Sequence, residues 1–155
     1  MEFPDLSALE NNKQSISFHV EEIDFVFEES EKVVQWLKCI AEHESKEIIA
    51  LDYVFCSDEY LHKINVEYLN HDTYTDIITF DLGVPDDRSI SGEIYISIDR
   101  VKENAQTHGC LYKDELRRVI VHGLLHLIGY PDKSKEEASL MRSKEEAALK
   151  TYREL

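Results

Sequence analysis

The most informative stretch of the sequence is Val119-Ile-Val-His-Gly-Leu-Leu-His-Leu-Ile-Gly-Tyr-Pro-Asp132. It decides both the fold and the functional site that we predict. His122 and His126 are four residues apart, which on a helix places them on one face, about 6 Å apart along the axis. Nearly every other residue of the stretch is apolar, so we expect the helix to be buried. Two imidazoles at this spacing on a buried helix can bind one metal ion.

Two glycines and a proline define the ends and the surroundings of this helix. Gly123 costs about 1 kcal/mol relative to alanine inside a helix, so we expect another part of the chain to approach the backbone there. Gly129 can end the helix in a left-handed conformation, and Pro131 prevents its continuation. The chain then turns back, and Asp132 can reach the two histidines. The stretch therefore predicts one Zn²⁺ per chain, bound by His122, His126 and Asp132 with a fourth position open.

Other interpretations of the same residues remain open at this point. The chain has seven histidines in 155 residues, so one pair at this spacing can arise by chance. A Pro-Asp pair after a helix is usually a turn. The first histidine is followed by Gly123, where an ordinary zinc protease has the glutamate that acts as its base. The motif is therefore not that of a common zinc protease.

The rest of the chain alternates strand and helix patterns early and is helical late. Strands are expected around residues 16–20, 49–55, 75–80 and 94–98. Helices are expected over residues 30–44, 99–108, 113–129 and from 134 onward, with a further helix capped by Ser57. Asp99 is expected to cap the helix that follows it, and Ser134 with Glu137 to form a capping box. We predict an α+β (mixed-sheet α/β) fold with about four strands and helices packed on them, as a single domain over residues 1–155.

Composition narrows the class of protein. Hydrophobic residues make up 43% and charged residues 32%, which is typical of a folded domain. The net charge of −15 disfavours non-specific binding to phosphate backbones, although it does not exclude a local basic cleft. No apolar run is long enough for a membrane span and residues 1–5 lack a signal-peptide pattern, so we expect a cytoplasmic protein without a membrane partner. The odd number of cysteines predicts buried, reduced thiols.

The stretch that contains the two histidines is similar to a known family. His122-Gly-Leu-Leu-His126-Leu-Ile-Gly129-Tyr130 resembles the pattern H-G-x-L-H-L-x-G-Y-D-H of the YbeY family of rRNA maturation factors and single-strand endoribonucleases. Glu137 and Met141 are in register with a glutamate and a methionine that follow this pattern. Residues 75–80 and 92–99 resemble two further segments of the family. The resemblance extends from about Ile64 to the C-terminus.

The chain departs from the family pattern at two places. Asp132 stands where the family has its third ligand histidine, and Pro131 replaces the preceding aspartate. An anionic ligand in place of a neutral one should make the metal a weaker Lewis acid. Leu69 stands where the family pattern N-x-x-Y-R has an arginine suited to contacting phosphate.

The resemblance implies a zinc-dependent, single-strand-specific endoribonuclease that acts in 16S rRNA maturation and ribosome quality control. Its expected partners are single-stranded RNA, rRNA and the ribosome or its assembly factors, without DNA. We expect His122, Glu137 and Asp76 to serve catalysis, with Glu137 or Asp76 assisting as a base. A capping role for Glu137 and a turn role for Asp76 are equally compatible with the sequence. Hydrolysis by water and attack by the ribose 2′-hydroxyl both remain possible mechanisms.

Two other functions are compatible with the same residues. One is a metallopeptidase-like hydrolase of another substrate, because His126-x-x-Gly129-x-x-Asp132 also resembles the end of metzincin-like zinc sites. The other is a ribosome-associated factor in which the zinc is structural. An exchangeable water on the metal favours an enzyme, whereas a fourth protein ligand favours a structural site.

Overall fold

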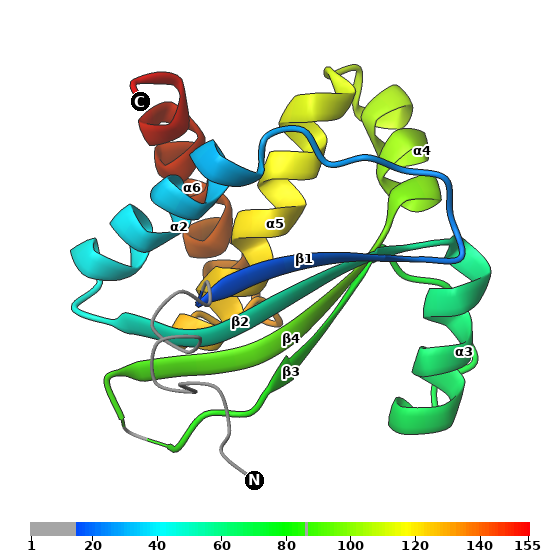
Figure 1. Cartoon of the computed structure of the whole chain (residues 1–155), viewed down its shortest axis with the longest axis horizontal. Coiled ribbons are helices and arrows are strands. Elements are labelled where there is room, and N and C mark those ends of the chain that lie inside the picture. Colours follow the sequence, from blue (N-terminus) through cyan, green and yellow to red (C-terminus); the bar gives the residue numbers. More distant parts are fainter. Residues whose placement is uncertain (1–14, 86) are drawn as a thin grey trace, which may run out of the picture.

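The computed structural model describes residues 15–85 and 87–155 as a four-stranded sheet with helices packed on it (Figure 1). The strands are β1 (Ile16–Glu21), β2 (Glu47–Cys56), β3 (Ile77–Asp81) and β4 (Ser89–Ser97). The helices are α2 (Ser30–His43), α3 (Asp58–Leu69), α4 (Ile98–His108), α5 (Tyr112–Ile128) and α6 (Lys135–Arg153). The predicted α+β class is therefore confirmed. Residues 1–14 lie outside the described residues. The expected domain over residues 1–155 and the expected lack of a signal peptide both include this segment.

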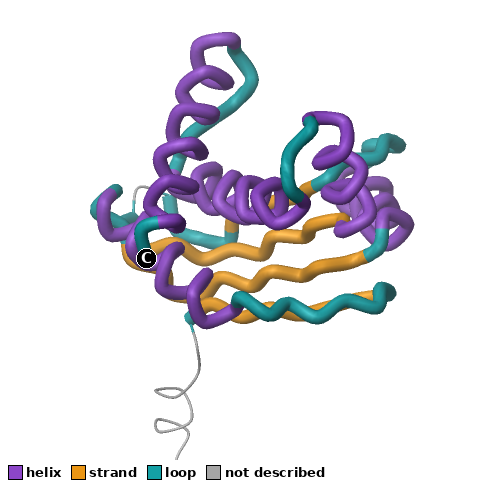
Figure 2. Tube along the Cα trace, turned by 90° about the horizontal axis from the view of Figure 1, so that it is seen from above, coloured by secondary structure: helices purple, strands orange, loops and turns teal. Residues whose placement is uncertain are grey.

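The sheet is mixed and its strand order is β1-β2-β4-β3. β1 pairs with β2 and β2 with β4 in parallel, whereas β3 pairs antiparallel with β4. Seen from above, the strands lie side by side with helices packed against them (Figure 2). β3 is an edge strand, so one side of its backbone is not paired within the sheet.

The main core lies between the sheet and helices α2, α5 and α6. Two buried hydrogen bonds tie these layers together: the Tyr53 hydroxyl donates to the carbonyl of Ile120 at 2.7 Å, and Trp36 Nε1 donates to the carbonyl of Ala148 at 2.7 Å. The first connects β2 to α5, and the second connects α2 to α6. On the other face of the sheet, α3 contributes Leu61 and Ile64 to a second, smaller apolar cluster. Helix α5 is therefore tied to the sheet, and α2 is tied to α6.

Several local expectations are confirmed and others are wrong. Ser57 and Ser134 are N-caps, and Ser134 forms the predicted capping box with Glu137. Asp99 is not the cap of α4: the Ser97 side chain accepts from the amide of Arg100, and Asp99 instead accepts from the amide of Asp58. The cap lies two residues earlier because the strand β4 leads directly into the helix.

The burial of several side chains differs from what the sequence pattern suggests. Ile49 is exposed, because a register shift between Ile48 and Ala50 turns Ile48 into the core in its place. Tyr68 lies outside the core near the end of α3, and Cys110 is exposed after the end of α4. The cysteines are free, but among them only Cys56 is buried. No helix within residues 15–85 and 87–155 is both long and apolar enough to cross a bilayer.

Candidate metal centre

Helix α5 lies unusually close to the sheet at Gly123. A Cβ atom at this position would lie 2.7 Å from Ile94 Cδ1, 3.0 Å from Ile94 Cγ2 and 3.2 Å from Ile77 Cδ1. The expectation that another part of the chain approaches this glycine is therefore confirmed. Because β4 and β3 contact the helix here, the neighbouring His122 is held beside the edge of the sheet.

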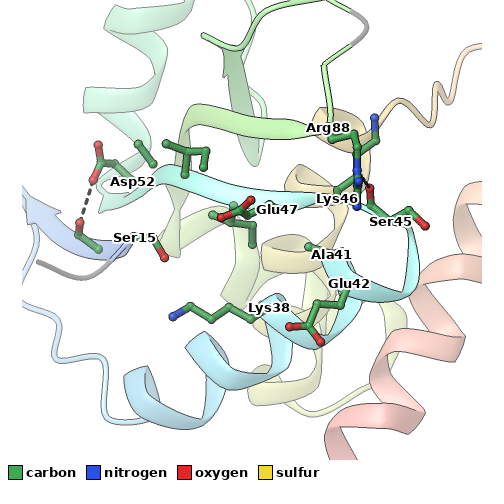
Figure 3. A pocket seen from close by; sticks show the side chains of 13 residues that line it. Ser15, Lys38, Ala41, Glu42, Ser45, Lys46, Glu47, Asp52 and Arg88 are labelled. Atoms are coloured by element: carbon green, nitrogen blue, oxygen red, sulfur yellow. Dashed lines mark hydrogen bonds between the residues drawn. The ribbon is translucent and has the colours of Figure 1, made fainter. Parts of the chain in front are cut away.

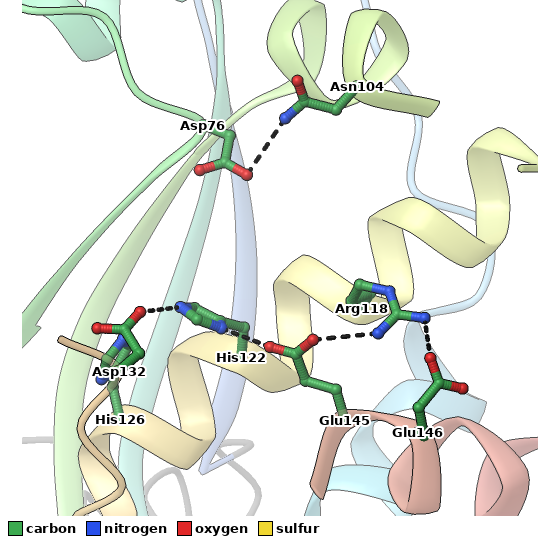
Figure 4. Close-up of polar contacts among 8 residues, drawn as sticks. All are labelled: Asp76, Asn104, Arg118, His122, His126, Asp132, Glu145 and Glu146. Carbon is green, nitrogen blue, oxygen red and sulfur yellow. Dashed lines mark hydrogen bonds and ion pairs between the residues drawn. The ribbon is translucent and has the colours of Figure 1, made fainter. Parts of the chain in front are cut away.

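The three residues that the sequence predicts as ligands come together after the helix ends. Gly129 has φ +126°, a conformation that side chains rarely adopt, and lets the chain turn away from α5. Asp132 Oδ2 then lies 3.4 Å from His122 Nε2 and 3.2 Å from His126 Nε2. One donor atom from each residue lies within 4.8 Å of the others. Figure 4 shows Asp132 and both imidazoles converging on one point.

The hydrogen bonding of His122 indicates that this point suits a cation. His122 Nδ1 lies 2.6 Å from Glu145 Oε2 and donates to it when the ring is neutral. The neutral ring then presents the lone pair of Nε2 toward the Asp132 carboxylate, where no hydrogen bond can form between two acceptors. A divalent ion among Nε2 of both histidines and the carboxylate would satisfy all three groups, and nitrogen and oxygen donors suit zinc. The donor set therefore fits a metal ion.

Glu145 contacts the candidate ligand His122 and is a residue of the site that the sequence interpretation did not identify. It is only 6% exposed, and its other oxygen accepts from Arg118 Nη1 at 3.1 Å. Burial alone would lower the pKa of the His122 imidazole, but the hydrogen bond and charge of Glu145 raise it above its ordinary value. A carboxylate in this position fixes the tautomer and orientation of a ligand histidine. Its signal in the sequence is an acid within the apolar stripe that Met141, Ala148 and Tyr152 form on α6.

The metal-ligand group opens into a pocket of about 650 Å³. Most of the rest of its wall comes from the end of α3, the loop that follows and strand β3. Asp76, a predicted catalytic residue, lines this pocket and lies across from His122 (Figure 4). Asp76 Oδ2 accepts from Asn104 Nδ2 at 3.5 Å, and burial raises the pKa of the Asp76 carboxyl.

Glu137, the other predicted catalytic residue, lies in a different environment. Its Oε1 accepts from the backbone amides of Lys133 at 3.1 Å and Ser134 at 3.0 Å. The bond from Ser134 belongs to the capping box at the start of α6, and the bond from Lys133 adds to it. Glu137 is not among the residues that line the pocket of the metal-ligand group. Its carboxylate holds the turn that follows Asp132.

The two arginines of α5 are engaged in ion pairs. Arg117 pairs with Glu29 at 2.6 Å, and Arg118 pairs with Glu145 and with Glu146. Both side chains are more than three-quarters covered. They therefore stabilise the packing between helices and are not free to contact a phosphate.

A larger pocket of about 930 Å³ lies elsewhere, between the end of α2 and strand β2 (Figure 3). Its charged lining residues are of both signs: Lys38, Lys46, Arg88, Glu42, Glu47 and Asp52. Within the part of the chain that the structure describes, the only cluster of metal-ligand side chains is that of His122, His126 and Asp132. The larger pocket is therefore not the one that contains the candidate metal ligands.

Comparison with known proteins agrees with this geometry. The family model described as endoribonuclease YbeY matches residues 11–153. The chain belongs to the YbeY family. A protein named endoribonuclease YbeY from Cytophaga hutchinsonii is 48% identical over 137 residues, which cover 88% of this chain and 95% of that protein. The protein of the same name from Flavobacterium johnsoniae is 47% identical over 131 residues, covering 84% and 93%.

A solved structure supports the fold of this YbeY chain independently. The solution structure of a protein from Thermotoga maritima superimposes with a TM-score of 0.63 at 25% sequence identity. The match covers 88% of this chain and 92% of the other. The resemblance expected from the histidine stretch is thereby confirmed, and with it the family.

Proposed function

We propose that this chain is a zinc-dependent endoribonuclease that cleaves single-stranded RNA, and that it acts in 16S rRNA maturation and ribosome quality control in the cytoplasm. Family membership supports the RNA substrate, because the relatives are named endoribonucleases. The observation that carries the proposal is the convergence of His122, His126 and Asp132 on the wall of an open pocket. The ribosome and its assembly factors are the proposed partners.

The side chains around the site have separate tasks in this proposal. His122, His126 and Asp132 would hold the ion, and Glu145 would keep His122 in the tautomer that leaves Nε2 free. When bound, the ion would polarise a phosphoryl oxygen and lower the pKa of a nucleophile. Glu137 would fix the turn that carries Asp132, since two backbone amides occupy its Oε1.

Asp76 is the residue best placed to accept a proton. It lines the same pocket, and burial raises its pKa, which makes the carboxylate a stronger base. Both cleavage by water and attack by the ribose 2′-hydroxyl require such an acceptor. We therefore assign proton transfer to Asp76 for either nucleophile.

One structural observation favours a second candidate, a metallopeptidase-like hydrolase. The edge strand β3 lines the pocket beside the histidines, and an extended peptide could add to its unpaired side as a further strand. A structural zinc is less well supported, because the group that the described residues form offers three ligands and borders an open pocket. RNA and peptide substrates therefore have to be compared directly.

The test combines metal analysis with cleavage assays on one preparation. We expect one divalent ion per chain in the wild type, loss of the ion in His122→Ala and His126→Ala, and cleavage of single-stranded RNA in preference to duplex RNA or casein. His43→Ala serves as the control, because His43 lies on α2 and the hydrogen bonds of its ring within the described residues go to Cys39. Equal metal content in all four proteins, or peptide cleavage without RNA cleavage, would contradict the proposal.

A further inference from the structure

The pocket of the metal-ligand group has an unusual charge for a site that takes RNA. Three carboxylates line it, those of Asp76, Asp81 and Asp132. No lysine or arginine is among its lining residues in the described part of the chain. Carboxylates repel a phosphodiester, so the chain must supply hydrogen-bond donors on the wall opposite the metal ligands. Leu69, which also lines the pocket, has no polar group to offer.

The wall contains a segment whose backbone is fixed by one buried side chain. Helix α3 ends at Asn70, which has left-handed dihedral angles of φ 55° and ψ 33°. The amide of His71 then donates to the carbonyl of Asn65 at 3.1 Å. The Asn65 side chain, 5% exposed, donates to the carbonyl of Thr73 at 2.8 Å and to its hydroxyl oxygen at 3.2 Å. Asn65 thus clamps residues 70–73.

This clamp leaves two donors available on the pocket wall. The Thr73 hydroxyl oxygen accepts from Asn65, so its own proton is free to be donated to a ligand. The His71 side chain is exposed, and it forms no hydrogen bond or ion pair with the described residues. By contrast, the hydroxyl of Thr75, further along the wall, donates to the carbonyl of Ile77 at 3.3 Å.

We propose that His71 and Thr73 form a subsite for a backbone phosphate of single-stranded RNA, adjacent to the phosphate that is cleaved. The proposal deepens the proposed function and rests on it for the identity of the substrate. An imidazole N–H and a hydroxyl are donors that a phosphate oxygen accepts, and the imidazole adds charge when it is protonated. Asn65 positions both donors before the substrate arrives, which lowers the cost of ordering the loop on binding.

Binding to the metal-free protein tests the subsite without any cleavage. The affinity of EDTA-treated protein for a short, fluorescently labelled RNA single strand is measured by anisotropy at low salt. We expect His71→Ala to raise Kd about tenfold, the usual effect of losing one hydrogen bond to a charged group. Thr73→Val should raise it several-fold, and His71→Lys, which retains an N–H donor, should bind like the wild type. His19→Ala is the matched control, because His19 is an exposed histidine on β1 that does not line the pocket.

Cleavage kinetics of the zinc-bound protein provide a second measurement. A contact to a phosphate that does not react is lost equally in the ground and transition states, so His71→Ala should raise KM with kcat and metal content unchanged. If the loaded wild type does not cleave RNA, the proposed function fails, and binding by the metal-free protein still decides the role of His71. The inference is overturned if folded His71→Ala binds the labelled strand as tightly as the wild type, or if the wild type does not bind it.

Discussion

The Nδ1 atom of His122 on α5 lies 2.6 Å from the Oε2 atom of Glu145 on α6. Each residue is held by its own helix, and Glu145 is further fixed by Arg118 at 3.1 Å. A carboxylate that accepts from the outer nitrogen of a ligand histidine increases the basicity of the ring as well as orienting it. The affinity of the site for a metal ion should therefore depend on the packing of α6 against α5.

Removing the charge of Glu145 should weaken metal binding. We expect Glu145→Gln to lower zinc affinity by about 10- to 100-fold, the usual effect of losing such a partner, because glutamine can accept from Nδ1 but carries no charge. Competition with a chromogenic chelator measures the affinity. Glu146→Gln is the control, since among the described residues Glu146 forms an ion pair only with Arg118 and is half exposed. Equal affinities in the two variants would mean that Glu145 serves packing alone.

Asp132 should be replaceable as a ligand by histidine but not by alanine. We expect Asp132→His to keep one metal ion per chain and Asp132→Ala to bind it far more weakly, because only the first retains a donor at this position. Elemental analysis after dialysis against a weak chelator distinguishes the two. If Asp132→Ala retained metal as the wild type does, Asp132 would be a residue of the turn and no ligand.

A cation on the pocket wall should accelerate RNA cleavage. Leu69 lines the pocket and is 41% exposed, so a longer side chain can extend from this position. A guanidinium there can form bidentate bonds to phosphate, and a donor that meets transition-state charge is worth about 3 kcal/mol in other enzymes. We expect Leu69→Arg to raise the initial rate at low salt and equal zinc content. An unchanged rate in the folded variant would indicate that another group already satisfies the phosphate.

The close contact at Gly123 should make this glycine difficult to replace. In Gly123→Ala the new methyl group would meet Ile94, which is fully buried, and overpacking of this kind costs about 1–3 kcal/mol. The better helix propensity of alanine would offset about 1 kcal/mol of this cost. We expect a net loss of stability in urea denaturation, partly restored in Gly123→Ala/Ile94→Val, which removes the atom at 2.7 Å. No restoration in the double variant would argue against the contact with Ile94 as the cause.

The sequence predicted those parts of the site that depend on neighbours along the chain. The four-residue spacing of His122 and His126 and the turn at Gly129 are local features, and the structure brings Asp132 to them. Glu145 was missed because its role depends on how α6 packs, which spacing alone does not reveal. The ion pairs of Arg117 with Glu29 and of Arg118 with Glu145 likewise depend on how distant elements pack.

The errors in the fold have similar physical causes. The strand around Ile49 was recognised, but its register shift was not, because a bulge depends on pairing with β4 and leaves no mark in the alternation. The cap of α4 was placed at Asp99, although Ser97 is an equally good capping residue and lies at the true end of the strand. In both cases the type of element was correct and its boundary was determined by tertiary contacts.

All residues that would hold the metal or orient its ligands lie between His122 and Glu145, in α5, the turn after it and α6. Most of the remaining wall of the pocket comes from another continuous segment, residues 65–81, which includes Asp76. Natural variation or engineering can therefore alter what the protein recognises by exchanging this second segment around a retained Asp76, without touching the metal ligands of the first. A chimera that receives this segment from another relative is the direct route to a nuclease of new sequence preference.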